Sequence, residues 1–359
     1  MANWKFEWFD RVDLTGEALA GTSTGTTHIM DMSAPPFTVS FASFMGEAPP
    51  FRPINQNVPL TPGSYLKFMD TDENEVDLTL FIKGTNRENL YNIIRGSATG
   101  NTGLSYLFSP VKADIWATLL NPPAGADKQR LLTGFGKLRV TSPAVVGGVP
   151  VVRDLICRCI SGFKIRNEDL FVNYAFCPLT FYANQPYWRS AVKKEILLGN
   201  RNQSVGSQAR NYPSWFTAPN SPAPGLDQLA IGAQYRYRKR FNITNLGDVP
   251  TPPIWTVTGP ASAPVFILEN PIHKDQPSIL SFNQDCVIGN GQNLVINIEN
   301  RTAVISGAVD GNVIKTINVN SQMWDIPTNL STMQVRVRDS NNTGTKVKLE
   351  YYERFLGAY

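Results

Sequence analysis

The chain has 359 residues, of which 42% are hydrophobic and 17% charged, and its formal net charge is +4. At roughly 150 residues per domain, this length predicts two domains, with three as the alternative. The net charge is too diluted for the class of proteins that bind nucleic acid through a basic surface. The charged share lies below the ~25% of an average soluble protein, which suits a surface that neighbouring molecules cover. The 27 glycines and 26 prolines favour many short strands over long helices.

Targeting signals and disulfides are not expected. Charges interrupt every apolar run of residues 1–10, so the sequence predicts no signal peptide. No stretch approaches about 20 apolar residues, which predicts no insertion into a membrane. The cysteines contain no Cys-x-x-Cys pair and are too sparse for a disulfide framework. We therefore expect buried, reduced thiols at Cys157, Cys159, Cys177 and Cys286.

The first clear pattern is a pair of alternating segments at residues 65–69 and 76–82. Apolar and polar residues alternate in both, and the acidic run 70–75 lies between them. This pattern is typical of two strands of a hairpin with one wet face.

A helix is predicted directly after these strands. Thr85 and Glu88 fit a capping box, and Leu90, Ile93 and Ile94 then form one apolar stripe. Gly96 or Gly100 would end the helix, and residues 104–120 fit either a helix or strands.

Strand signals return at residues 136–141, 151–158 and 170–182. The first domain is therefore predicted as residues 1–190, rich in β-structure with one helix. Residues 191–234 are expected to be a linker or an extended arm, because Asn, Ser, Gln, Gly and Pro dominate from residue 199 onward. Short strands with regular turn signals predict an antiparallel β-sandwich over residues 235–359. The fold class is therefore mainly β with minor α.

Catalytic and metal-binding patterns are weak. Neither His28 nor His273 has a Cys, His or carboxylate at ligand spacing, except in the weak pattern His273-Lys-Asp275. The acidic run starting at Asp70 begins like a calcium loop, but Glu75 stands where that loop requires glycine. We expect turn or surface histidines and a solvated turn.

Two further motifs have ordinary structural interpretations. Cys157 and Cys159 would share one face of a strand, more typical of a buried sheet face than of a metal site. The run Tyr235-Arg-Tyr-Arg-Lys-Arg240 interleaves aromatic and cationic residues as single-strand nucleic-acid binders do. A strand with one wet face is the favoured interpretation of this run. The sequence thus predicts no catalytic residue, no cofactor and no metal, and a protein that is not an enzyme.

Several segments together resemble the distal tail protein family of long-tailed bacteriophages. They occur in the order in which that family has them, and the resemblance covers about four-fifths of the chain, with residues 190–235 departing from it. The most specific segment is Phe241-Asn-Ile-Thr-Asn-Leu-Gly-Asp-Val-Pro-Thr-Pro-Pro-Ile-Trp. The others are Leu294–Ile305, Trp324-Asp-Ile-Pro-Thr-Asn, Val347–Arg354 and, in the first domain, Leu179–Trp188 together with residues 65–95.

The resemblance implies a structural subunit of the phage particle, made and assembled in the cytoplasm of the bacterial host. Copies would form a ring, commonly sixfold, at the distal end of the tail tube. The first domain would form the ring, and the second, a galectin-like sandwich, would hang outward. The implied partners are further copies of the chain, the tail tube protein and the tip or baseplate hub protein, with the tape measure protein as a further candidate. DNA would only pass through the lumen.

Candidate assembly contacts follow from strand edges and exposed aromatics. An edge strand at residues 76–82 could pair between subunits through Val76, Leu78, Leu80 and Ile82. Trp215 and Phe216 could anchor the arm on a neighbour. The alternative function is a carbohydrate-binding or receptor-binding tail accessory protein. A hydrolase with a site assembled from distant residues is a third hypothesis.

Overall fold

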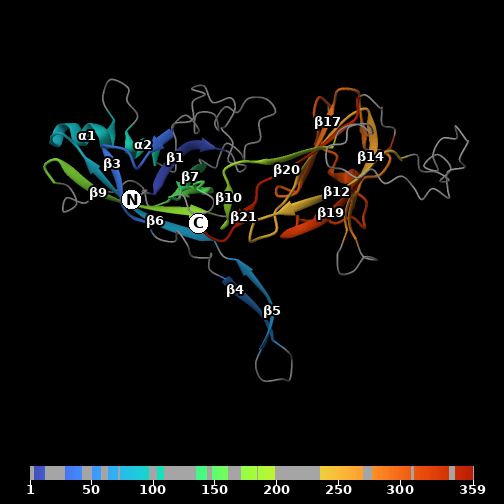
Figure 1. Ribbon diagram of the computed structural model, residues 1–359, viewed down its shortest axis with the longest axis horizontal. Helices are drawn as coiled ribbons and strands as arrows, with labels where there is room; N and C mark the ends of the chain where they lie inside the picture. Colours follow the sequence, from blue (N-terminus) through green and yellow to red (C-terminus); the bar gives the residue numbers. More distant parts are fainter. Residues whose placement is uncertain are drawn as a thin grey trace, which may run out of the picture. The chain divides into compact units, whose positions relative to one another are not determined.

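The computed structural model is mainly β and divides the chain into two compact units (Figure 1). Unit 1 comprises Met1–Ala191 and Phe355–Tyr359, and unit 2 comprises Val192–Arg354. The predicted fold class is confirmed. The structure describes residues 4–12, 29–42, 51–57, 64–71, 73–96, 103–108, 135–143, 148–160, 171–183, 185–198, 235–269, 277–308, 311–338 and 344–358.

Unit 1 is built on one antiparallel sheet with the strand order β2-β1-β7-β8-β9-β6-β3. Two short strands extend it, because β10 (Trp188–Ser190) pairs with β8 and with β21 (Arg354–Phe355). The strands of the main path are β1 (Lys5–Val12), β2 (Ile29–Asp31), β3 (Phe37–Ala42), β6 (Asn74–Lys83), β7 (Phe135–Thr141), β8 (Val152–Cys159) and β9 (Tyr174–Ala183).

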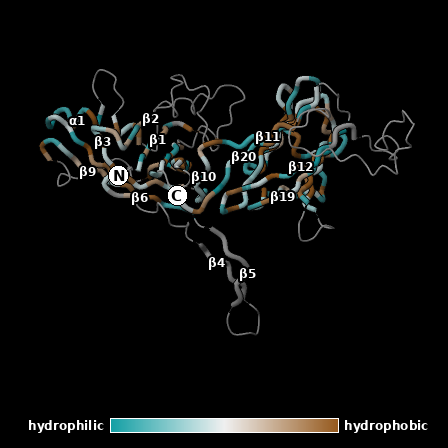
Figure 2. Tube along the Cα trace, viewed as in Figure 1, coloured by the Kyte–Doolittle hydropathy of each residue, from teal (hydrophilic) through white to brown (hydrophobic). Residues whose placement is uncertain are grey.

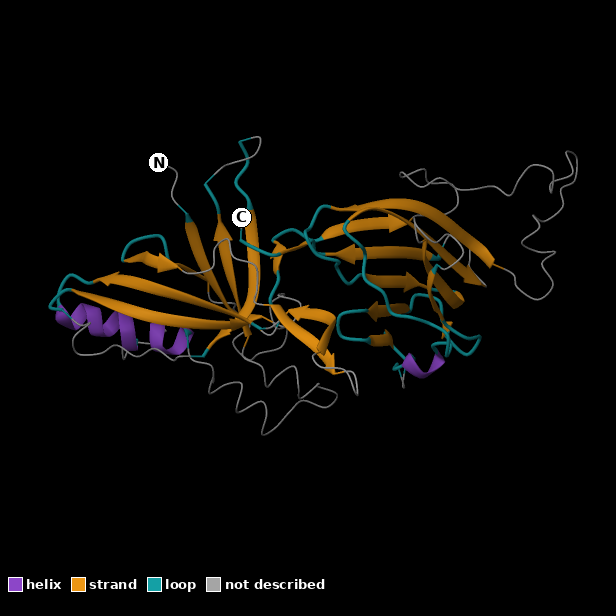
Figure 3. Cartoon of the chain, turned by 90° about the horizontal axis from the view of Figure 1, so that it is seen from below, coloured by secondary structure: helices purple, strands orange, loops and turns teal. Residues whose placement is uncertain are grey.

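One face of this sheet holds the core of unit 1. Every second residue of β6 is buried, and the same alternation follows β9. Figure 2 colours these strands by hydropathy. Helix α1 (Arg87–Arg95) lies along this sheet (Figure 3) and adds Leu90 and Ile94 to the core. Trp8 packs against Phe181 with ring centroids 5.0 Å apart. Period-two alternation thus gives β6 and β9 one core face and one outer face each.

The predicted helix is confirmed, but its N-cap is Asn86 rather than Thr85. The Asn86 side chain accepts a hydrogen bond from the Asn89 backbone N–H at 2.8 Å, and Asn89 Oδ1 accepts one from the Thr85 N–H at 3.1 Å. Two asparagines therefore perform the reciprocal capping expected of Thr85 and Glu88. The helix ends at Gly96, where φ is 87°. A four-residue helix, α2 (Leu104–Leu107), follows, and residues 109–120 lie outside the described part.

The predicted hairpin between residues 65–69 and 76–82 is wrong. Strand β5 (Ser64–Thr71) pairs with β4 (Phe51–Asn57), whereas β6 pairs with β9 and β3. The apolar side chains of β6 complete the core only beside the matching alternation of β9, a strand about a hundred residues away in sequence. That long-range match outweighs the local turn signal at residues 70–75.

Unit 2 is an antiparallel sandwich, which confirms the predicted architecture. One sheet has the order β11-β20-β13-β17-β18 and the other β12-β19-β14-β15, with β16 pairing β14. One core cluster takes residues from both sheets and centres on Trp255, which is fully buried. The elements are β11 (Lys194–Leu198), β12 (Tyr235–Asn245), β13 (Ile254–Thr258), β14 (Ala261–Glu269), β15 (Ser278–Ser281), β16 (Val287–Ile288), β17 (Asn293–Asn297), β18 (Thr302–Ile305), a 3-10 turn η4 (Ile314–Thr316), β19 (Asn329–Arg338) and β20 (Lys346–Tyr351).

The two ends of unit 2 differ from the domain limits expected from sequence. Residues 194–198 fall in the expected linker, yet as β11 they pair with β20 of the sandwich. Residues 355–359, expected in the second domain, belong to unit 1, where Ala358 is fully buried in the core. Both differences arise because short segments without a turn signal pair or pack with distant strands. Among the described residues, no helix has the length and hydropathy needed to cross a membrane.

The return of the C-terminus predicts a measurable contribution to unit 1. The Arg153 guanidinium lies 3.3 Å from the centroid of the Phe355 ring, and Phe355 packs against the core. We expect Phe355→Ala to lower the stability of unit 1 by about 2 kcal/mol, because it removes a half-buried ring and a cation–π contact. Calorimetry should show that unit 1 unfolds at a lower temperature, while the unfolding temperature of unit 2 is unchanged. Val149→Ala, at a 66% exposed site of unit 1, is the control and should change little. Equal effects of the two changes would contradict the prediction.

Candidate assembly surfaces

The apolar residues proposed as an edge contact lie in the core of unit 1. Val76, Leu78, Leu80 and Ile82 are at most 3% exposed. Strand β6 has β9 on one side, and β3 pairs with its residues 78–82 on the other. This segment is therefore not an edge strand, and we assign its apolar side chains to the fold of the unit itself.

The remaining residues singled out in the sequence divide into two groups. Trp215, Phe216, His28 and His273 lie outside the described residues, so their roles stay predictions. The cysteines Cys157, Cys159, Cys177 and Cys286 are all free and buried, as expected. Burial raises the pKa of the Cys157 thiol far above its ordinary value and that of Cys286 to about 11, which keeps both protonated. Within the described ranges, no three His, Cys, Asp or Glu residues form a metal-binding group.

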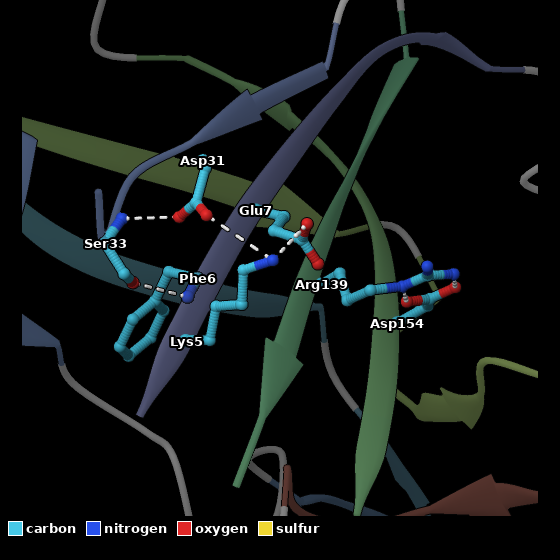
Figure 4. Close-up of polar contacts among 7 residues, drawn as sticks. All are labelled: Lys5, Phe6, Glu7, Asp31, Ser33, Arg139 and Asp154. Atoms are coloured by element: carbon cyan, nitrogen blue, oxygen red, sulfur yellow. Dashed lines mark hydrogen bonds and ion pairs between the residues drawn. The ribbon is translucent and has the colours of Figure 1, made fainter. Parts of the chain in front are cut away.

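The outer face of β1, β7 and β8 is occupied by charged side chains that satisfy one another (Figure 4). Asp154 accepts two hydrogen bonds from Arg139, at 2.7 and 2.9 Å, and Lys137 lies 3.5 Å away. The Lys5 ammonium contacts both Glu7, at 2.9 Å, and Asp31, at 3.4 Å.

These contacts link neighbouring strands through ion pairs and do not form a reactive site. Burial lowers the pKa of Lys137, and Asp154 opposes that shift. The hydrogen bonds that Arg139 donates to Asp154 raise the pKa of Arg139. Both cations also lie over the Phe9 ring, 4.7 and 4.8 Å from its centroid. The geometry is that of a cross-strand ion network, which favours the register of the sheet.

A different outer face, on β6 and β9, combines aromatic rings with carboxylates. Phe81 lies 5.3 Å from Phe176 and 5.7 Å from Tyr174, and Phe171 stacks on Tyr174 at 4.3 Å. We call this surface the aromatic–acidic face, and it consists of Phe81, Phe171, Tyr174, Phe176, Glu75 and Asp77. Phe171 is 42% exposed, and Glu75 and Asp77 are exposed at the start of β6. Sequence patterns did not predict this face, although Phe81 in the otherwise polar phase of β6 was a signal of it.

Unit 2 carries a cationic counterpart on the outer face of β12, β19 and β14. Arg240 forms a two-point ion pair with Glu269, with Nε 2.6 Å from Oε1. Arg336 donates two hydrogen bonds to Gln334 Oε1, at 3.1 and 2.8 Å. Arg338 shares the strand phase of Arg336, opposite to that of the buried Val335 and Val337. We call the surface formed by Arg240, Arg336 and Arg338 the arginine face.

The end of the run Tyr235–Arg240 contributes Arg240 to this arginine face. The structure gives the backbone of its first four residues as part of β12, and their side chains lie outside the described part. The predicted strand is confirmed. Arg240 lies opposite Gln334, two residues from Arg336, whereas Lys239 lies opposite Val335 and is buried.

Three of the sequence segments quoted above converge at one corner of unit 2. The Asn245 side-chain amide donates to the carbonyls of Val249 and Ile326, each at 3.2 Å, and its Oδ1 accepts the Gly247 N–H at 3.0 Å. Asn245 is 1% exposed. The Thr251 backbone N–H also donates to the Ile326 carbonyl, and its hydroxyl donates to the carbonyl of Tyr352.

The C-terminal strand completes this corner. The N–H groups of Asp248 and Val249 donate to the Arg354 carbonyl, and Glu353 Oε1 accepts the Leu246 N–H at 3.2 Å. A Cβ at Gly247 would lie 2.3 Å from that Arg354 oxygen, so only glycine fits the close approach. The segments around residues 245, 326 and 353 therefore owe their pattern to one shared set of buried hydrogen bonds.

This corner predicts a large effect of a single substitution. Asn245→Ala removes the side-chain partner of the Val249 carbonyl and of the Gly247 N–H, and it leaves the Ile326 carbonyl with the Thr251 N–H alone, which should cost about 3 kcal/mol. The thermal midpoint of unit 2 should fall by about 6–12 °C. Asn242→Ala is the matched control on the same strand, because Asn242 is exposed and its Oδ1 accepts a hydrogen bond from the exposed-side Thr332 hydroxyl. Similar losses from both variants would show that the corner does not stabilise the unit.

Comparison with solved structures finds phage proteins. The chain is similar to the Dit protein of phage SPP1, described as a paradigm of the hub adsorption apparatus in phages that infect Gram-positive bacteria, with 9% identity and a TM-score of 0.48. The match covers 98% of this chain and 99% of that one. It is also similar to a chain of the phage P2 baseplate in its activated conformation, solved with calcium and with strontium, with 11% identity, a TM-score of 0.45 and 98% coverage of each chain. No protein-family model and no curated protein sequence matches the chain.

Proposed function

We propose that this chain is a structural subunit of the distal end of a bacteriophage tail. Copies form a closed sixfold ring that joins the tail tube to the tip or baseplate. Unit 1 forms the ring, unit 2 lies on its outside, and DNA passes through the lumen without being bound. The further partners are the tail tube protein, the hub protein and the tape measure protein. The chain is made in the bacterial cytoplasm and ends in the virion, and it needs no cofactor.

The corner of unit 2 is the observation that supports this proposal best. The resemblance to the distal tail family rests on segments that lie about 80 to 110 residues apart in the chain. Asn245 joins Ile326, Leu246 joins Glu353, and Thr251 joins Tyr352 through hydrogen bonds. Short motifs that match a family by chance have no reason to meet at one buried site. Their convergence supports a common structural origin for the pattern.

The β4–β5 ribbon supports assembly rather than a monomeric role. In the described part of the chain, β4 and β5 pair only with each other and form a separate two-stranded sheet (Figure 1). An isolated two-stranded hairpin is marginally stable in water. Its sequence is rich in large apolar residues, including Phe51, Ile54, Phe68 and Met69. A neighbouring subunit that covers the ribbon would stabilise it, and head-to-tail contacts of this kind close into rings.

Removal of the ribbon tests this proposal. Phe51 and Thr71 are paired at its base, so residues 52–70 can be replaced by a short Gly-Ser linker without separating the ends. We expect wild-type protein to give closed rings in negative-stain images and one discrete oligomer in native mass spectrometry. The ribbon variant should remain folded and monomeric, because it lacks the element that a neighbour covers.

The control keeps the paired strands. Asn57 and Ser64 are the last pair, so an Asn-Gly turn can replace residues 58–63. This variant should still form rings. A wild-type protein that stays monomeric at all concentrations, alone and with tail tube protein, would rule out the proposed function.

The proposed arm has a separate test. Residues 191–234 were expected to be a linker or an arm, and residues 199–234 lie outside the described part. If Trp215 and Phe216 anchor a neighbour, deletion of residues 205–225 should weaken the oligomer, because buried aromatic anchors dominate many interfaces. The double change Trp215→Ser and Phe216→Ser should weaken it equally, as measured by dissociation on dilution. If both variants assemble like wild type, the segment is a linker and not an arm that binds a neighbour.

A further inference from the structure

We propose that the arginine face of one copy docks on the aromatic–acidic face of a neighbouring copy. This inference rests on the proposed function, because it requires that copies of the chain assemble. It adds a specific contact, between unit 2 of one subunit and unit 1 of the next. The occupant of each face is thus a second copy of this chain.

The aromatic–acidic face has the composition of an interface. The core of unit 1 takes the opposite phase of β6 and β9, so Phe81, Tyr174 and Phe176 lie on the side that the core does not use. Phe171 is 42% exposed and Val172, beside it, is 74% exposed. Contiguous exposed aromatic and apolar side chains mark interaction sites on soluble proteins.

The carboxylates of this face lie at its other end. Glu75 is opposite Tyr182, and Asp77 is opposite Thr180, whose hydroxyl donates to Asp77 Oδ1 at 2.8 Å. The Tyr182 hydroxyl donates a hydrogen bond to the Glu73 carboxylate, and this bond raises the pKa of Tyr182. The face therefore combines an apolar region with an acidic region about 20 Å away along the strand. A matching surface must supply cations that also tolerate contact with aromatic rings.

The arginine face meets both requirements. A guanidinium binds carboxylates through its planar fork and also stacks on aromatic rings, which an ammonium does less well. The Arg240 side chain is 28% exposed while it holds Glu269, and Arg336 and Arg338 are partly exposed. Val265 of β14 lies opposite Arg336, is partly exposed and adds apolar area. The face can thus engage carboxylates and rings together.

The two faces also match in length and spacing. Strands β6 and β9 pair over ten residue pairs, and so do β12 and β19. Both ladders are therefore about 33 Å long and can pack face to face. Glu75 and Asp77 are two residues apart on one strand, as are Arg336 and Arg338. Each pair therefore places its charges about 7 Å apart, so two ion pairs can form in one orientation.

A contact of this kind is heterologous, because two different surfaces of the chain meet. Repetition around an axis generates a ring when the rotation closes. Each single contact can be weak, since closure makes all contacts of the ring intramolecular. The charges would select the correct register and partner more than they would supply affinity.

A charge-swap experiment on the full chain tests the contact. Glu75→Arg and Arg336→Glu each replace an attraction by a repulsion, and we expect each to weaken association between copies about tenfold at low ionic strength. The variant that carries both changes should recover to within about threefold of wild type, because it restores opposite charges. Association is measured by sedimentation equilibrium, and about 0.5 M salt should reduce the differences.

Two charge-matched controls accompany the swap. Glu195→Arg and Lys346→Glu change exposed residues on the other sheet of unit 2, and circular dichroism confirms folding in every variant. We expect the controls to associate like wild type. The inference is overturned if the double variant shows no recovery, or if the controls weaken association as much as the swap residues.

The outcomes separate this inference from the proposed function. Rings that form equally well from all charge variants would overturn the contact and leave the ring proposal intact. A wild-type chain that never associates would overturn both. Loss of binding to a heparin column by Arg336→Glu, with association unchanged, would assign the arginine face to a polyanion and also overturn the contact.

Discussion

Strands β6 and β9 of unit 1 each have two faces, and the fold buries one of them. In β6, Leu78, Leu80 and Ile82 fill the core, so the alternate residues must point away from it. Where the outer residues are charged, as around Asp154, they form ion pairs with one another within the subunit. Where they are aromatic, as at Phe81 and Phe176, the rings are only partly buried, and the neighbouring Phe171 is 42% exposed. This difference between outer faces is what makes assembly through unit 1 physically reasonable.

Unit 2 depends on a second constraint, the satisfaction of buried backbone groups at its corner. Turns and strand ends leave carbonyls that a sandwich cannot pair within its sheets. Asn245 supplies two donors and one acceptor at that place, and Gly247 allows the chain to approach Arg354. The corner thereby connects the end of β12 to the segments around Ile326 and Glu353. A pattern of this kind tolerates little change, which explains why a few residues carry the resemblance to the distal tail family.

Sequence periodicity predicted the mainly β class, the sandwich of unit 2 and helix α1, because these follow from local alternation and spacing. Pairing partners could not be predicted in the same way. The turn signal at residues 70–75 suggested a hairpin, yet β6 pairs with β9 and β5 with β4. The candidate surfaces could not be predicted for the same reason, because they depend on which strands pair. Alternation predicted one wet phase of β6, but not the strands that pair with it, so an exposed edge at residues 76–82 was expected where β9 and β3 lie. Phe81 in that wet phase was the one local sign of the outer face.

The central claim is that copies of this chain assemble through the outer face of unit 1. Hydroxyl-radical footprinting of the monomeric and assembled protein tests it most directly, because it reads the solvent access of individual side chains. The account predicts that oxidation of Phe171, Tyr174 and Phe176 falls on assembly, while the exposed Val319 of unit 2 keeps its rate. Unchanged oxidation of these three rings in a fully assembled sample would contradict it.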